Sequence, residues 1–155
     1  MRVIARYVLL LLLSLVVFFI QQSPLLVVMG SRPNLLLMVG MMIVTLDKGW
    51  TSLISMVGII VGATLIAEPF WIVPVSICAG VILLGRIIRN QLTGNAWIDY
   101  CVLLLSGEII FMSISWIRMG MMVSYTQLAW ELTYTGIVGI IVWGIGTALR
   151  RITLQ

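Results

Sequence analysis

The sequence contains no histidine and only two cysteines among its 155 residues. Without an imidazole it can form neither a Ser-His or Cys-His catalytic pair nor an HExxH zinc motif. Cys78 and Cys101 make no CxxC pair and lie within or beside apolar runs, so we expect them to pack structurally. There is also no Gly-rich phosphate loop and no acidic pair at metal-ligand spacing. We therefore expect no enzyme and no catalytic, cofactor or metal site.

Charged residues are scarce as well, at 9% of the chain against roughly 25% in soluble domains. Hydrophobic residues make up 62%, and the mean hydropathy is +1.21. Because a spanning helix takes roughly 20 residues, the chain has room for one all-helical transmembrane domain, residues 1–155. The net charge of +4 comes from isolated or paired basic residues beside apolar runs. These are typical of topology signals, and we expect no binding of nucleic acid.

Six apolar runs predict six transmembrane helices, at about residues 3–20, 33–48, 50–67, 70–85, 98–117 and 132–149. The first run resembles a signal peptide, but no small-residue cleavage site precedes Gln21, so we expect an uncleaved span. The second begins at Pro33-Asn34, because proline suits the first turn of a helix, and is short for a bilayer. The third and fourth runs are separated only by Glu68-Pro69, which predicts a tight hairpin.

The basic residues predict the topology of these six spans. With the N-terminus inside, all of them except Arg32 and Arg118 lie on the cytoplasmic side. An odd number of spans would move Arg150 and Arg151 outside, so we expect both ends of the chain in the cytoplasm. Most tryptophans lie near predicted span ends, as in an aromatic belt, whereas Trp143 lies well inside the sixth span.

Glu108 lies near the middle of the fifth predicted span, where an ionised carboxylate costs about 2.5–3.5 kcal/mol on insertion scales. One interpretation is a partner contact or ligand site inside the bundle. The other is a protonated carboxyl group bonded to a facing Ser, Thr or backbone carbonyl. We expect Glu68 to cap its turn or to pair with Arg32 or Arg118, and Asp99 and Glu131 to be solvated at the ends of spans.

The segment from Arg118 to Glu131 is predicted to be an outer loop in which apolar residues, including Tyr125 and Trp130, alternate with polar ones. It fits an interfacial amphipathic segment, a docking surface for another membrane helix, or a surface that faces lipid. Gly58 and Gly62, in the third span, have the spacing of a helix-packing face.

Several of these features together resemble the MreD family of rod shape-determining membrane proteins. In that family the first span ends in Gln and a small or polar residue, and an Arg-Pro-Asn or Pro-Asn motif opens the second. A glycine-rich third span that usually ends in Asp, where this chain instead has Glu68, follows. Cytoplasmic arginines and an acid in the fifth span come after it. The matching positions here are Gln21-Gln22-Ser23-Pro24, Arg32-Pro33-Asn34, Gly58-x-x-x-Gly62, Glu68, Arg86, Arg89 and Glu108.

This resemblance implies a fold similar to the six-helix substrate-binding subunits of energy-coupling-factor vitamin transporters. It implies a non-enzymatic scaffold of the bacterial cell-elongation machinery, which makes peptidoglycan, located in the inner membrane. The expected partner is a single-span MreC-type protein, with indirect links to the MreB cytoskeleton and to the RodA glycosyltransferase with its penicillin-binding transpeptidase. The candidate partner-binding or structural residues are Arg32, Pro33, Asn34, Glu68, Glu108, Tyr125 and Trp130.

The alternative function is capture of a vitamin in a cavity lined by Glu108, as the substrate-binding subunit of a transporter. A vitamin site needs several convergent hydrogen-bonding groups, and polar residues at membrane depth are few in this sequence. That scarcity favours the scaffold.

Overall fold

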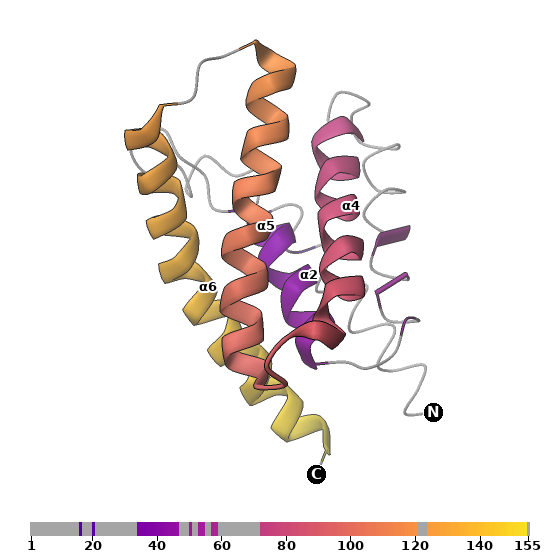
Figure 1. Cartoon of the computed structure of the whole chain (residues 1–155). Helices are drawn as coiled ribbons and strands as arrows, with labels where there is room; N and C mark the ends of the chain where they lie inside the picture. The colour runs from indigo at the N-terminus through magenta and orange to yellow at the C-terminus, as the bar shows by residue number, and fades with distance from the viewer. Residues whose placement is uncertain are drawn as a thin grey trace.

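The computed structural model describes residues 34–46, 72–120 and 124–154, together with residues 16, 20, 50, 53–54 and 57–58. All secondary structure in these residues is helical. It comprises α2 (Leu35–Leu46), α4 (Ile72–Ile88), the short 3-10 helix η3 (Arg89–Gln91), α5 (Ala96–Met119) and α6 (Tyr125–Leu154) (Figure 1). Most residues of the first and third predicted spans lie outside the described residues.

Three of these helices are long and apolar enough to cross a membrane, over Val73–Gln91, Ala96–Arg118 and Tyr125–Ala148. They lie where the fourth, fifth and sixth spans are expected, although each extends further along the chain than its apolar run. In the part of the chain that the structure describes, the only secondary structure is helical and three helices have membrane length, which is the architecture expected of an α-helical membrane protein.

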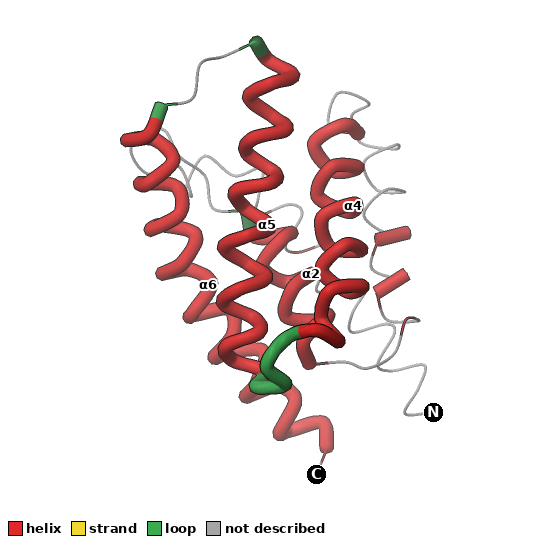
Figure 2. The backbone as a smooth tube through the Cα atoms, in the orientation of Figure 1, coloured by secondary structure: helices red, strands yellow, loops and turns green. Residues whose placement is uncertain are grey.

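Helix α5 begins and ends at identifiable capping residues. The side chain of Asn95 accepts a 3.1 Å hydrogen bond from the backbone N–H of Trp97, in the first turn. At the other end Gly120 adopts a left-handed conformation, with φ of 64°, and its N–H bonds back to the carbonyls of Ile117 and Trp116. Figure 2 shows the short loop that joins η3 to α5.

Helix α6 begins at Tyr125, so the prediction of an outer loop over residues 118–131 is wrong in its extent. Arg118 belongs to the last turn of α5, and only residues 120–124 separate the two helices. The N–H of Leu128 bonds to the Ser124 carbonyl, which starts the helical ladder of α6. Polar residues such as Gln127 and Glu131 lower the hydropathy of this segment, but they do not break a helix.

Helix α2 is short and lies at the centre of the described bundle, in contact with α4, α5 and α6 (Figure 1). Its 12 residues are buried from Leu35 to Thr45. At 1.5 Å per residue it is about 18 Å long, well short of a hydrocarbon core of roughly 30 Å. The helix alone is therefore too short to cross a membrane.

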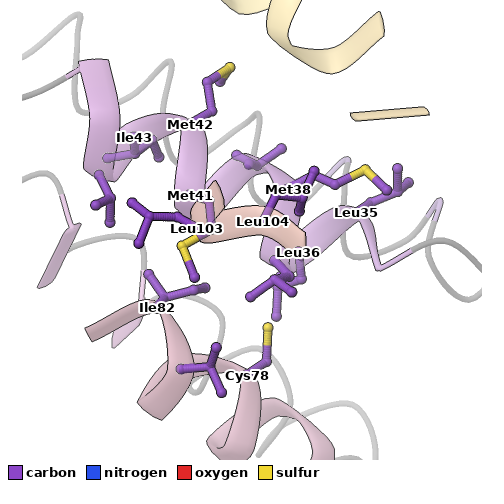
Figure 3. Close-up of a cluster of buried hydrophobic side chains, with 14 of the residues drawn as sticks. Leu35, Leu36, Met38, Met41, Met42, Ile43, Cys78, Ile82, Leu103 and Leu104 are labelled. Atoms are coloured by element: carbon purple, nitrogen blue, oxygen red, sulfur yellow. The ribbon is translucent and has the colours of Figure 1, made fainter. Parts of the chain in front are cut away.

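The core forms where methionines of α2 enter gaps left by glycines on its neighbours. A Cβ atom added at Gly85 of α4 would lie 3.0 Å from Met41 Sδ, and one added at Gly107 of α5 would lie 3.0 Å from Met41 Cε. Figure 3 shows Met41 among the buried side chains of this core, including Ile82 and Leu103. Small residues allow such close helix approach within a membrane bundle.

Candidate functional site

Asn34 caps the N-terminal end of α2, where the Pro-Asn motif lies in the sequence. Its Oδ1 accepts a 3.1 Å hydrogen bond from the Leu37 N–H, and Cys78 Sγ of α4 lies 3.9 Å from the same oxygen. The side chain of Asn34 is buried. Since the first N–H groups of a helix have no partner within it, this bond satisfies a donor that water would not reach easily.

Glu108 lies near this end of α2. Its neighbour Gly107 packs against Leu37, with 3.5 Å between an added Cβ and Leu37 Cδ1. The carboxyl group is within electrostatic range of Cys78 on α4 and of Glu131 on α6. Glu108 is only 2% exposed, yet its Oε2 atom has no hydrogen-bond partner among the described residues.

The pairing of α5 with α6 determines which residues of the two helices lie at the same level. The two helices are antiparallel neighbours (Figure 1). Tyr100 donates a 3.1 Å hydrogen bond to the Gly139 carbonyl, and Leu104 also contacts Gly139. Glu108 lies one turn beyond Leu104 on α5, and Thr135 lies one turn before Gly139 on α6, so this register puts the two residues at about the same level.

Thr135 is 1% exposed, and its hydroxyl oxygen has no hydrogen-bond partner among the described residues. The lack of a partner distinguishes the Thr135 hydroxyl from other hydroxyls in these helices. Several helical Ser and Thr side chains bond to a backbone carbonyl three or four residues earlier: Thr45, Ser106, Ser113, Ser115, Thr133 and Thr147. Glu108 and Thr135 are thus two buried residues, at about the same level of adjoining helices, that each carry an unsatisfied polar atom, and each atom is costly to leave unpaired.

Two arginines satisfy the C-terminal end of α2. Arg86 Nη1 lies 3.4 Å from the Val44 carbonyl oxygen, and Arg89 Nη2 lies 2.6 Å from the Thr45 carbonyl oxygen. The Arg86 guanidinium also lies 5.4 Å from the ring centre of Trp50. The sequence marks Arg86 and Arg89 as topology signals, but their contacts with α2 depend on tertiary packing and were not predicted.

Asp99 is buried, so the prediction of a solvated span end is wrong for this residue. Its carboxylate accepts hydrogen bonds from the Thr93 N–H, the Thr93 hydroxyl and the Gly94 N–H, at 3.1, 2.7 and 3.1 Å. These bonds fix the loop that joins η3 to α5. The sequence places an acid in the first turn of a helix but does not indicate that the preceding loop folds over it.

Trp143, which lies inside the sixth predicted span, packs against aromatic rings of α5. Its ring centre is 4.8 Å from that of Tyr100 and 5.6 Å from that of Trp97. Together with the Tyr100 hydrogen bond, this cluster joins the first half of α5 to the second half of α6. Cys78 and Cys101 are free thiols.

Helix α6 is the least enclosed of the long helices. Fewer residues are buried in its membrane-length segment, Tyr125–Ala148, than in the corresponding segment of α5, Ala96–Arg118. Its exposed side, which we call the α6 outer face, consists of Trp130, Thr133, Ile137, Ile140, Ile141, Gly144 and Ile145. Tyr125, in the first turn, is 82% exposed. Both aromatic candidates in this region are therefore on the helix surface.

The candidate residues thus divide into three groups. Asn34 and Glu108 lie near one another at the N-terminal end of α2, while Tyr125 and Trp130 lie on the exposed start of α6. Arg32, Pro33 and Glu68 lie outside the described residues. Thr135 was not among the candidates; a Thr in an apolar run is common, and only the pairing of α5 with α6 distinguishes it.

Comparison with known proteins yields no relative. The chain matches no protein-family model, and neither the curated proteins nor the solved structures contain a significant match. The resemblance to the MreD family therefore rests on the sequence pattern alone. Among the described residues no group of three or more His, Cys, Asp or Glu side chains could hold a metal ion.

Proposed function

We propose that this protein is a non-enzymatic membrane scaffold of the bacterial cell-elongation machinery, and that it binds the transmembrane helix of a single-span, MreC-type protein. Through that partner it is linked to the MreB cytoskeleton and to the RodA glycosyltransferase with its transpeptidase. The observation that supports this proposal most directly is the α6 outer face, a long apolar helical surface that the described bundle leaves uncovered.

The chemistry of the α6 outer face suits a second helix. Within a bilayer, association depends on close packing rather than on removal of apolar surface from water. Gly136 and Gly144 leave open space: a Cβ atom added at either has no described neighbour within 4 Å. Ile137 and Ile141, each 57% exposed, could then pack beside the approaching backbone. Lipid is the alternative occupant of this face.

The finer topology belongs to the same proposal. In this topology the protein crosses the bacterial inner membrane six times, and both of its ends lie in the cytoplasm. The charge distribution supports this arrangement, since Arg86 in the last turn of α4 and Arg89 in η3 lie next to the loop that joins α4 to α5. Single cysteines at Asn95 and Ser124, in a variant without Cys78 and Cys101, test it. Asn95→Cys should be labelled only from the cytoplasm and Ser124→Cys only from outside.

Site-specific photo-crosslinking tests the partner. A photoreactive amino acid at Ile137 or Ile141 should form a covalent product with a co-expressed MreC-type protein. Ile109 and Ile114 of α5, each 43% exposed, provide matched controls on another apolar surface. Equal yields from α5 and α6, or no product from α6, would contradict binding at the α6 outer face.

A second candidate function, capture of a vitamin-sized molecule, is favoured by one observation. Asn34, Cys78 and Glu108 bring polar groups from three helices close to the N-terminal end of α2. A transporter subunit should be stabilised thermally by its small-molecule ligand in the absence of any partner. Stabilisation by a vitamin, with no partner complex, would count against the scaffold.

A further inference from the structure

The α5–α6 interface contains a buried polar site that the described part of the chain does not complete. Glu108 Oε2 and Thr135 Oγ1 are unsatisfied, and both side chains are at least 98% buried. A hydroxyl on a membrane helix usually has an acceptor available in its own backbone, as Thr147 has in the Trp143 carbonyl. Thr135 does not use this acceptor, so its hydroxyl remains available to another group.

The surface of α6 next to Thr135 is free of close neighbours among the described residues. Gly136 follows Thr135 directly, and a Cβ atom added there has no described neighbour within 4 Å. Residues Ser124 to Gln127, at the start of α6, are exposed, so the outer end of this helix has few contacts with α5. A helix packed against α6 at Gly136 therefore lies next to Thr135 along the chain, within reach of a long side chain.

We infer that Glu108 and Thr135 form a hydrogen-bonding site for a donor-bearing side chain of the partner's transmembrane helix, carrying an amide, ammonium or guanidinium group. This inference rests on the proposed function and specifies its contact. Carboxylate oxygens accept such donors readily, and Thr135 can accept or donate a second bond. Because this contact is buried away from water, the protein would recognise a partner span that is apolar except for one polar side chain.

The experiment compares the isolated protein with the complex. Thr135→Val removes only the hydroxyl, and Glu108→Met retains nearly the length of the side chain without its polar atoms. Because an unsatisfied buried group is replaced by an apolar isostere, neither variant should lower the thermal midpoint of the isolated protein. Each should weaken the complex with the co-expressed MreC-type protein by roughly three- to twentyfold, as loss of one hydrogen bond between membrane helices does.

Thr147→Val is the matched control, because it makes the same substitution on α6 at a hydroxyl that is already bonded. It should leave the affinity of the complex unchanged. If Thr135→Val and Glu108→Met both bind the partner as well as the wild-type protein does, the inference is overturned and the proposed function stands.

Two further outcomes would also overturn the inference. A clear fall in the thermal midpoint of isolated Thr135→Val would mean that the hydroxyl is satisfied within the free protein, for instance through a trapped water that bridges it to Glu108. Absence of any complex with the wild-type protein would remove the proposed function and this contact together.

Discussion

Arg89 donates a hydrogen bond of 2.6 Å from Nη2 to the carbonyl oxygen of Thr45, at the C-terminal end of α2. The last four carbonyls of a helix have no N–H partner within it, so donors from elsewhere in the protein or from water must replace them. A guanidinium group supplies several donors at once, and its positive charge complements the negative end of the helix dipole. Arg89 therefore ties the C-terminal end of α2 to η3.

We predict that Arg89→Leu lowers the free energy of unfolding by about 1.5–3 kcal/mol, the range for hydrogen bonds to charged groups. The substitution leaves the Thr45 carbonyl without this donor. Titration with SDS in mixed micelles measures the effect. The control is Arg118→Leu, at an exposed arginine in the last turn of α5. Equal destabilisation by both variants would mean that α2 does not depend on the Arg89 contact.

At the opposite end of α2 the corresponding prediction concerns Asn34. Replacement of this N-cap by alanine should lower the free energy of unfolding by about 1 kcal/mol, because the Leu37 N–H loses its acceptor. Asn34→Ser should retain most of the stability, since a serine hydroxyl also caps a helix. If Ser and Ala prove equally destabilising, the contribution of Asn34 lies in its size or in its contact with Cys78 rather than in capping.

These two helix ends differ in what the sequence reveals about them. The start of α2 could be predicted, because Pro-Asn before an apolar run is a local signal of a helix N-terminus. The arginines that bind its C-terminal carbonyls lie more than 40 residues away in the chain, on α4 and η3. No local pattern indicates such a contact, since it follows from the packing of α2 against α4.

The start of α6 was placed seven residues too late for a different reason. Hydropathy locates the part of a helix that faces lipid, and Thr126, Gln127 and Glu131 are polar, so the apolar run begins only at Leu132. The helix itself continues through these residues because none of them breaks it. Thr135 was missed because its burial depends on how α6 is rotated about its axis. Successive residues of a helix point about 100° apart, and the sequence does not show which of them faces the bundle.

Asp99 provides a third test, in the loop between η3 and α5. Because its carboxylate accepts three hydrogen bonds from Thr93 and Gly94, we predict that Asp99→Ala lowers the free energy of unfolding by about 2–3 kcal/mol. Asp99→Asn should have a smaller effect, because the amide oxygen still accepts. Proteolysis between Gln91 and Asn95 should become faster in the alanine variant. Unchanged cleavage and stability would show that the loop folds without these bonds.

The last prediction concerns two glycines of α6. A Cβ atom at Gly139 would lie 2.5 Å from Leu104 Cδ2 and 3.3 Å from the Tyr100 hydroxyl oxygen, whereas one at Gly144 would meet no described atom within 4 Å. Gly139→Ala should force α5 and α6 apart and lower the free energy of unfolding by about 1–3 kcal/mol. Gly144→Ala should be neutral or stabilising by up to about 1 kcal/mol, since alanine favours a helix.

The same pair of variants separates the interior of α6 from its outer face. Gly139→Ala should also disturb the Glu108–Thr135 level of the interface, one turn away, and so weaken the partner complex along with the fold. Gly144→Ala should preserve the fold, and any loss of binding would then come from the filled gap on the α6 outer face. Circular dichroism melting and co-purification of the partner measure the two effects. If Gly139→Ala is as stable as Gly144→Ala, the close packing of Leu104 and Tyr100 against α6 is refuted.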